Sequence, residues 1–441
     1  MSHPVLTDKQ NQALASALAD AKSRYVAAHP LSQEQHRKAA EVLPGGNTRT
    51  VLFSEPFPIT LVGGRGCKVT ALDGQEYIDF LGDYSAGLYG HSDPVLRKAL
   101  MAALDHGWVM GGHTRLEEEL ARLICARFAS IDLVRFTNSG TEANLFAIAA
   151  ARAISGRNKV VVFEGAYHGG VFMFGAKPSP LTAPFDFVKA PYNDAGGTRA
   201  LLDALGDQIG CVVIEPMQGS AGCIAADRAF LEMLREWTRA HGALLVFDEV
   251  MTSRLAPGGL QAVRGVSPDL TTLGKYVGGG LSFGAFGGSA EVMRRFDPQQ
   301  PDALAHAGTF NNNVFTMAAG AAGLRDVYTA SAAVALNARG DGLRDRLNTV
   351  AREARFAMQF TGVGSMMNVH MCPGVVRSIR DLERSTKPLA ELFYFQALDN
   401  GVWLARRGMV NLSLPVGDAE CDRLVRAVEA FVESGNRILA V

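Results

Sequence analysis

The chain has 441 residues and little that would suit it to a membrane or to nucleic acid. No apolar run reaches the roughly 18 uncharged residues that a membrane-spanning helix needs, so we expect no membrane partner. The 43 basic and 44 acidic side chains nearly cancel, and the sequence therefore offers no basic excess for binding nucleic acid. The polar stretch 1–16 lacks the apolar segment of a secretory signal, so we expect no such signal.

Cysteine pairs and metal motifs are also missing. The six cysteines lie far apart and form no CxxC pair, so we expect reduced thiols in a cytoplasmic protein. The ten histidines include no HExxH spacing, and we expect no metal site. What the chain does have is apolar material, because 48% of its residues are hydrophobic and 20% are charged. That composition is enough for a large buried core.

The order of strands and helices predicts an α/β fold. From about residue 93 to 325, short apolar strands alternate with amphipathic helices, which is typical of a mostly parallel central sheet covered by helices. Residues 8–42 are expected to be helical, and 68–80 form a hairpin with its turn at Asp73-Gly74. We therefore predict a large domain over 76–325 and a small α+β domain built from both chain ends, 1–75 and 326–441.

The first chemically distinctive strand end lies at 132–145. A strand is expected to end at Phe136 and a helix to begin at Thr141, with Ser139 and Gly140 in the turn between them. Backbone N–H groups and hydroxyls at the positive end of a helix suit a phosphate group. An ordinary Ser/Thr helix cap accounts for the same residues equally well.

Two further strands end in carboxylates. Glu215 follows CVVI and Asp248 follows LLVF, and one helix separates these segments, so the two strands are expected to be neighbours. A buried carboxylate needs a cationic partner or several donors. A protonated ring nitrogen would be such a partner for Asp248. The alternative is structural, with Asp248 capping a helix and Glu215 meeting an arginine.

Lys275 is the third chemically distinctive residue, after the turn at 139–141 and the strand-end carboxylates. It stands between an apolar strand and three consecutive glycines at 278–280, where a low-dielectric pocket favours the neutral amine that a Schiff-base nucleophile requires. A phosphate anchor, a carboxylate for a ring nitrogen and an imine-forming lysine are what pyridoxal 5′-phosphate requires.

Six motifs extend this pattern over about residues 40–320: SGTEAN, YHGG, EPMQGSAG, LLVFDEVMTSR, TTLGKYVGGG and AGTFNNN. Through them the sequence resembles the class III aminotransferases, pyridoxal phosphate-dependent enzymes of fold type I. PGGN and GKYVGGGLSFGAFGG are similar to the subgroup of glutamate-1-semialdehyde aminomutase. PGGNTRTVLF and RRGMVNLSLP resemble the β-phenylalanine (β-amino acid) aminotransferases within it.

The resemblance implies a role for each matching residue. Lys275 would form the Schiff base and move the proton, and Asp248 would pair with the pyridine nitrogen. Glu215 would lie among the cofactor contacts or just behind them. Thr309 would reach the phosphate in the neighbouring subunit, which implies a homodimer with active sites at its interface. The remaining cofactor contacts would be Ser139, Gly140 and Thr141 at the phosphate, Tyr167 and Val250 on the two ring faces, and Gln218 near the ring hydroxyl.

The same resemblance assigns substrate carboxylates to Arg49 and Arg407, since arginine binds carboxylates bidentately. Two arginines suit a dicarboxylate acceptor or a β-amino acid donor, and either could take either carboxylate. Ser220 stands where many class III enzymes have a glutamate that neutralises the active-site arginine. An apolar wall for an aromatic side chain would come from Val51, Phe53, Tyr84 or Tyr89.

These assignments predict an aminotransferase. The donor would be a β-amino acid, in particular an aromatic one such as β-phenylalanine, and the acceptor 2-oxoglutarate or pyruvate. The alternative is a glutamate-1-semialdehyde 2,1-aminomutase, which needs no external keto acid. A non-catalytic cofactor-binding scaffold is the third possibility, but it would not need Lys275, Asp248 and the phosphate turn together.

Overall fold

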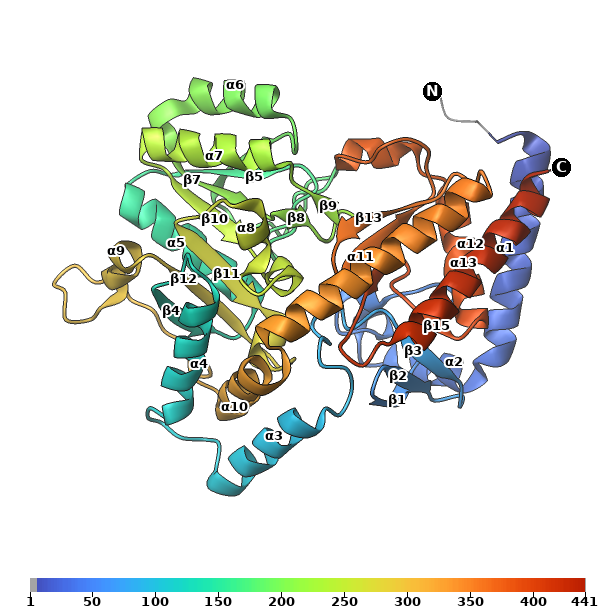
Figure 1. Ribbon diagram of the computed structural model, residues 1–441, viewed down its shortest axis with the longest axis horizontal. Helices are drawn as coiled ribbons and strands as arrows, with labels where there is room; N and C mark the ends of the chain where they lie inside the picture. The colour runs from blue at the N-terminus through green and yellow to red at the C-terminus, as the bar shows by residue number, and fades with distance from the viewer. Residues whose placement is uncertain (1–5, 441) are drawn as a thin grey trace.

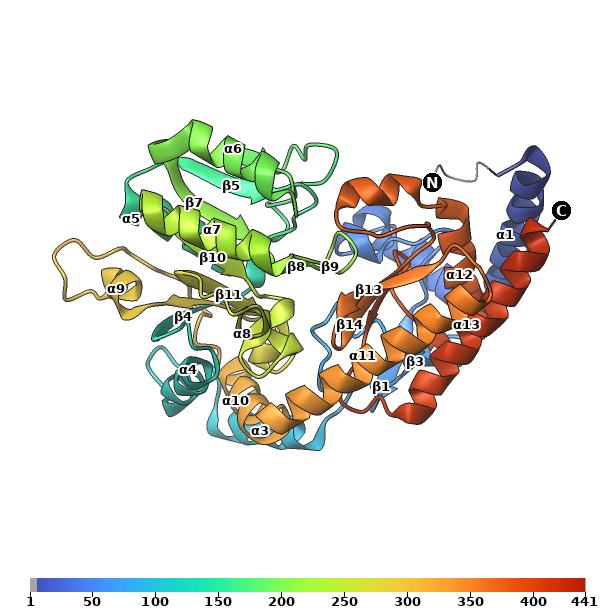
Figure 2. The same cartoon turned by 45° about the horizontal axis from the view of Figure 1, so that its top comes forward.

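The computed structural model describes residues 6–440. A large domain surrounds a seven-stranded sheet, and a smaller domain combines both ends of the chain (Figures 1 and 2). Near the two ends, helices α1 (Asp8–Ala28) and α13 (Asp418–Leu439) contact each other. The α/β fold with a mostly parallel central sheet, predicted from the strand–helix alternation, is confirmed.

The central sheet has the strand order β4-β12-β11-β10-β7-β5-β6, and β12 alone runs antiparallel to its neighbours. The expected neighbours β7 and β10 do pair in parallel. Every residue of β7, β10, β11 and β12 is buried, and because side chains alternate between the two faces, both faces must be covered. The strands are β4 (Leu133–Thr137), β5 (Lys159–Phe163), β6 (Asp186–Ala190), β7 (Ile209–Ile214), β10 (Leu244–Asp248), β11 (Leu270–Gly274) and β12 (Gly284–Gly288).

Helices α5 and α7 pack directly on this sheet, and α6 packs on α7. Helix α7 buries one face formed by Phe230, Leu231, Leu234 and Trp237, as its amphipathic sequence predicts. Its one buried charged residue, Arg235, is paired with Asp269. The helices of this domain are α3 (Pro94–His106), α4 (Arg115–Arg127), α5 (Gly140–Ser155), α6 (Ala195–Leu205), α7 (Arg228–His241), α8 (Gly259–Arg264), α9 (Ala290–Met293) and α10 (Val314–Ala322).

The small domain joins the two ends of the chain in one sheet. The predicted hairpin is present as β2 (Lys68–Ala71) and β3 (Glu76–Asp79), with Gly74 at φ +94° in its turn. This sheet has the order β1-β2-β3-β15, so β3, which lies beyond the predicted division at residue 75, pairs with a strand from the C-terminal part. The division into three segments stays a prediction. The other strands are β1 (Leu61–Arg65), β15 (Val402–Trp403), β13 (Gln359–Val363), β14 (Met366–His370), β16 (Met409–Asn411), and the short pair β8 (Met217–Gln218) and β9 (Ile224–Ala225).

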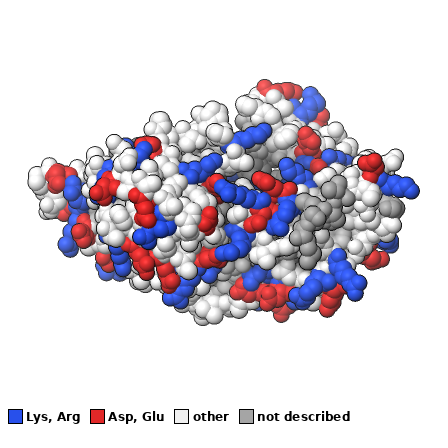
Figure 3. Space-filling model, turned by 90° about the horizontal axis from the view of Figure 1, so that it is seen from above, with Lys and Arg blue, Asp and Glu red and all other residues white. Residues whose placement is uncertain are grey.

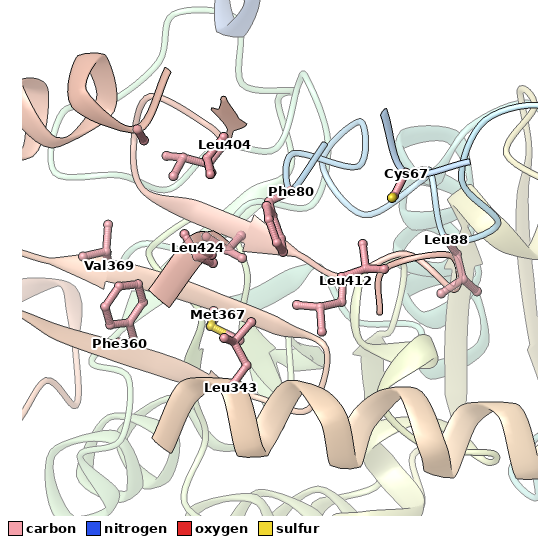
Figure 4. Close-up of a cluster of buried hydrophobic side chains, with 14 of the residues drawn as sticks. Cys67, Phe80, Leu88, Leu343, Phe360, Met367, Val369, Leu404, Leu412 and Leu424 are labelled. Atoms are coloured by element: carbon pink, nitrogen blue, oxygen red, sulfur yellow. The ribbon is translucent and has the colours of Figure 1, made fainter. Parts of the chain in front are cut away.

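Helix α11 (Ala330–Glu353) runs from the large domain along the small one (Figure 1). Its Leu343 packs into an apolar cluster with Phe360, Met367 and Leu424, all buried (Figure 4). The remaining small-domain helices are α2 (Pro30–Ala39) and α12 (Lys387–Asp399). The same cluster includes Leu273 of β11 and Ala285 of β12, so this core is continuous between the small domain and the central sheet.

Acidic and basic side chains are interspersed over the face of the molecule that Figure 3 presents, in agreement with the near-neutral net charge. Across residues 6–440, no helix combines the length and the apolar character needed to cross a bilayer.

Candidate active site

A cavity of about 410 Å³ opens at the carboxyl edge of the central sheet. The strands β4, β7, β10 and β11 end at this edge, which is where ligands bind in open parallel sheets. Lys275, Asp248 and Glu215, which the sequence analysis placed at three separate strand ends, all line this one cavity.

Asp248 is buried, and its carboxylate is held by three donors. The Asn144 side-chain amide and the His168 Nδ1 each lie 2.8 Å from Oδ2, and the Val250 backbone N–H donates to Oδ1 at 3.0 Å. Asn144 is itself oriented by the Thr272 hydroxyl, at 2.8 Å from its Oδ1. Asp248 therefore does not cap a helix, as the structural alternative supposed, but carries fixed charge into the cavity.

His168 is one of the site residues that sequence reasoning missed, with Asn144 and Asp83. It is buried, and its Nε2 has no hydrogen-bond partner among the described residues. Burial lowers the pKa of His168, but the hydrogen bond to Asp248 and the charges of Asp248 and Glu215 outweigh it, so that the pKa lies above its ordinary value. The histidine therefore stabilises the buried carboxylate. Its place beside Tyr167, inside YHGG, was the signal that could have found it.

Glu215 is held by backbone donors and meets no arginine. Its Oε2 accepts from the Tyr167 N–H at 3.0 Å and its Oε1 from the Gly219 N–H at 3.2 Å, so the arginine of the structural alternative is absent. Burial raises the pKa of Glu215 to about 7, although the charge of His168 and these backbone hydrogen bonds oppose the shift. Glu215 thus joins two loops at the wall of the cavity.

Lys275 directly follows β11 and has φ +57°, in the left-handed region that a lysine rarely adopts. Its Nζ donates to the Tyr84 carbonyl at 2.8 Å. Burial lowers the pKa of the amine to about 8, with Asp83 opposing the shift and Arg49 and Arg407 adding to it. A larger fraction of this amine is therefore neutral near pH 7 than of an ordinary lysine.

The predicted phosphate turn lies at the start of α5, which begins at Gly140, one residue earlier than expected. The Ser139 hydroxyl caps the helix by accepting from the Glu142 N–H at 3.2 Å, and the Thr141 hydroxyl accepts from the Gly170 N–H at the same distance. Both hydroxyls keep a hydrogen to donate, and the first amides of the helix have no partner within it. Ser139, Gly140 and Thr141 all line the cavity.

Glycine is required where the YHGG turn meets this helix. Gly169 has φ +125°, and a Cβ there would lie 2.3 Å from the Thr141 hydroxyl oxygen. Only a glycine lets the turn close over the start of α5. Tyr167 and Val250 also line the cavity, as their predicted contacts with two ring faces require.

Two predicted cofactor contacts lie outside the cavity. Gln218 is fully buried and donates to the Glu164 carbonyl at 2.9 Å, while its Oε1 has no partner among residues 6–440. Thr309 is exposed on the surface. Their roles near a ring hydroxyl and at a neighbouring subunit's phosphate stay predictions.

The two predicted substrate arginines flank one tyrosine. The guanidinium carbon of Arg49 lies 5.7 Å from the centre of the Tyr84 ring, and that of Arg407 lies 5.1 Å from it. Arg49 forms an ion pair with Asp83, 2.7 Å between Nη2 and Oδ1. Arg407 instead contacts the Ser220 hydroxyl at 3.3 Å, and no carboxylate of the described chain lies within ion-pair distance of it. The two arginines therefore lie beside the same ring, and of the two only Arg49 has an acidic partner among the described residues.

Of the residues considered for an apolar wall, Tyr84 is placed at the rim and Tyr89 is not. Tyr89 is buried in the core, where its hydroxyl packs against Gly323. Val51 and Phe53 are exposed, and the Val51 carbonyl accepts from the Tyr84 hydroxyl at 3.1 Å. The cavity itself supplies apolar surface from Met217, Leu281 and Phe283.

Comparison with known proteins agrees with this arrangement. Residues 53–432 match the family model of class III aminotransferases. The chain is 53% identical to the β-phenylalanine transaminase of Variovorax paradoxus over 97% of its own length and 98% of that protein. The chain belongs to the class III aminotransferase family. Enzymes of this family depend on pyridoxal 5′-phosphate and have fold type I, so both sequence-based expectations are confirmed.

A solved structure and a more distant relative define its place in the family. The crystal structure of the β-phenylalanine aminotransferase from Variovorax paradoxus superimposes with a TM-score of 0.95, at 52% identity, and covers 96% of this chain and 98% of that one. The glutamate-1-semialdehyde 2,1-aminomutase of Methanothermobacter thermautotrophicus is 34% identical over 93% of this chain and 99% of the relative. The aminomutases are thus the more distant group.

The residues present fit the cofactor of the family. The cavity offers an amine with a lowered pKa, a buried carboxylate supported by a histidine, and a helix N-terminus with two hydroxyls, each at its rim or floor. An aldehyde, a ring nitrogen and a phosphate each find the matching chemical group here.

The lowered pKa of Lys275 can be tested by chemical labelling. In protein stripped of cofactor, acetylation of Lys275 by acetic anhydride should rise with a midpoint near pH 8, because burial disfavours the charged amine. Peptide mass spectrometry after brief labelling from neutral to strongly alkaline pH measures the curve, with the exposed Lys177 as the internal reference. Coincident curves for the two lysines would contradict the assignment.

Proposed function

We propose that the chain is a β-amino acid aminotransferase that takes an aromatic donor such as β-phenylalanine and passes its amino group to 2-oxoglutarate or pyruvate. The observation that carries the proposal is the pair Arg49 and Arg407 beside the same Tyr84 ring. Arg49 lines the cavity that contains Lys275, and the charge of Arg407 contributes to the lowered pKa of that lysine. The similarity to a β-phenylalanine transaminase over nearly the whole chain supports the same donor.

The cofactor would be held by groups already in place. Lys275 would bond its aldehyde, Asp248 would face its ring nitrogen, and Ser139, Gly140 and Thr141 would bind its phosphate. Tyr167 and Val250 would cover its two faces, Glu215 would act from the cavity wall, and Gln218 would act from behind it. When bound, the cofactor withdraws electrons from the carbon that carries the amino group.

The protein's own contribution is proton transfer and fixed charge. Since burial lowers the pKa of the Lys275 amine to about 8, it can take up and return a proton near neutral pH. The buried Asp248, fixed by Asn144 and His168, supplies negative charge that needs no reorganisation during reaction.

Substrate recognition would rest on carboxylates. A guanidinium binds a carboxylate with two parallel hydrogen bonds, and Arg407 is free of a competing carboxylate among residues 6–440. Two arginines suit a dicarboxylate such as 2-oxoglutarate, or a donor whose carboxylate lies one carbon farther from the amine.

A homodimer is part of the proposal. Helix α3 and the following loop expose Trp108, Val109 and Met110, with Val109 83% exposed, and the neighbouring Phe310 is 63% exposed. The Trp108 ring packs on Phe315. Met110 and the neighbouring Gly107 line an apolar groove of about 520 Å³ among α3, α4 and α10. Apolar patches of this kind mark protein–protein contacts. A second copy covering the patch would also cover Thr309, whose predicted partner is in the other subunit.

All six cysteines are free. A reducing compartment keeps thiols in this state, and we propose a cytoplasmic location on that ground.

Light scattering tests the dimer. The protein should have twice the mass of the chain, and Val109→Asp should shift it toward the monomer and lower its activity, since a charge would be buried in the interface. Val375→Asp is the matched control, because Val375 is 73% exposed and lies outside the patch. A fully active monomer at assay concentration would exclude the dimer.

Product analysis tests the reaction. Protein incubated with cofactor, β-phenylalanine and 2-oxoglutarate should form glutamate, and with pyruvate it should form alanine. Lys275→Ala should abolish turnover because it removes the group that moves the proton, whereas Lys177→Ala should retain it. Chromatography of the products gives the result. Isomerisation of glutamate-1-semialdehyde without a keto acid, and no glutamate from β-phenylalanine, would support the aminomutase instead.

Asp248→Asn tests the fixed charge. The substitution keeps the shape of the side chain but removes its charge, so kcat should fall by about 10²- to 10³-fold or more. Steady-state kinetics and thermal unfolding together separate lost chemistry from lost folding. Asp207→Asn, at a side chain 83% exposed, is the control and should leave kcat unchanged. Near-normal turnover by Asp248→Asn would refute the role.

A further inference from the structure

The Arg49–Asp83 ion pair is an obstacle to the substrate carboxylate that Arg49 is proposed to bind. The Nη2–Oδ1 distance is 2.7 Å, and both residues line the cavity that contains Lys275. The side chains are 51% and 63% exposed, so the pair is open to exchange rather than locked in the core. A ligand carboxylate can approach Arg49 only by replacing the carboxylate that is already there.

The backbone around Asp83 is held in place. Gly82, Asp83, Tyr84 and Ser85 have φ values of +54°, +39°, +54° and +79°, a left-handed run that three non-glycine residues rarely adopt in succession. Such a conformation persists only where surrounding contacts impose it.

Several of those contacts can be named. The Asp79 carboxylate accepts from the N–H groups of Leu81 and Gly82 at 2.8 and 2.9 Å. The buried Arg254 donates to the Ser85 carbonyl at 3.2 Å, and Lys275 donates to the Tyr84 carbonyl. The Asp83 carboxylate is therefore presented at the rim by a fixed backbone.

The two arginines beside Tyr84 have partners of different charge. Arg407 has the neutral Ser220 hydroxyl as its partner at 3.3 Å, while Arg49 has a carboxylate. Both guanidiniums lie near the same Tyr84 ring. Asp83 thus selectively neutralises one of two arginines that face a common space.

We propose that Asp83 is a specificity-determining residue: it occupies Arg49 when no ligand carboxylate is bound and is displaced by the substrate carboxylate. The inference rests on the proposed function and deepens it. Asp83 weakens carboxylate binding at Arg49 by competition. In return, it keeps Arg49 neutralised when the bound molecule has no carboxylate to offer there. Asp83 thereby lets one site alternate between molecules with different numbers of carboxylates.

The test is binding of a non-reacting acid to the holoenzyme, measured by titration calorimetry. The probe is 3-phenylpropanoate, which has a carboxylate and a ring but no amine, and its uncharged amide is the matched ligand. D83N should tighten the acid by about two- to fivefold, a small factor because exposed ion pairs contribute little. The amide should bind D83N no more tightly than the unsubstituted protein. Asparagine tolerates left-handed backbone well, so D83N is expected to fold.

Arg49→Gln completes a double-mutant cycle. In that background D83N should no longer tighten the acid, because the competition requires the guanidinium. Equal tightening of acid and amide, an unchanged affinity for the acid, or the same gain without Arg49 would each overturn the role of Asp83. If β-phenylalanine gives no product while D83N still tightens the acid in the Arg49-dependent way, the proposed donor fails and the role of Asp83 stands.

Discussion

The site depends on keeping one carboxylate charged at the end of a fully buried strand. Burial of an unpaired carboxylate is costly, and β10 leaves Asp248 only 4% exposed, at the wall of the cavity. Asn144 from α5 and His168 from the turn after β5 therefore both reach the same oxygen, Oδ2. Three separate segments meet at this point, and the cavity is the space that remains between them. The chemistry and the fold are thus fixed by the same hydrogen bonds.

Lys275 imposes a second constraint through the backbone. It stands in a left-handed conformation, and its amine is bonded to the carbonyl of Tyr84, which is left-handed as well. Neither conformation is favourable alone, and both persist because buried groups such as Arg254 hold the segment around Ser85. The reactive amine and the rim that carries Tyr84 and Asp83 are therefore positioned together.

Much of this arrangement could be predicted because local sequence determines it. Apolar runs such as LLVF specify parallel strands, and parallel strands bring Asp248 and Lys275 to one edge wherever the helices lie. The side chains that contact those residues were harder to predict from the sequence. His168 reaches Asp248 across 80 residues of sequence, and although the YHGG motif could have placed it in the site, the motif does not show which residue it contacts. Asp83 was not predicted for a related reason. Its position depends on a left-handed backbone, and non-glycine residues give no sequence signal for that conformation.

The same backbone constraints determine where the cavity has a counter-charge for the arginines beside Tyr84. An enzyme that binds two substrates in turn at one site must accept different charges without leaving a guanidinium unpaired in a partly enclosed space. A glutamate beside Arg407 would neutralise that arginine, but here its partner is the uncharged hydroxyl of Ser220. Asp83 instead neutralises the other arginine, Arg49. Because the backbone at Asp83 is fixed by Asp79 and Arg254, the counter-charge stays at the rim whichever molecule is bound, and the exchange needs only side chains to move.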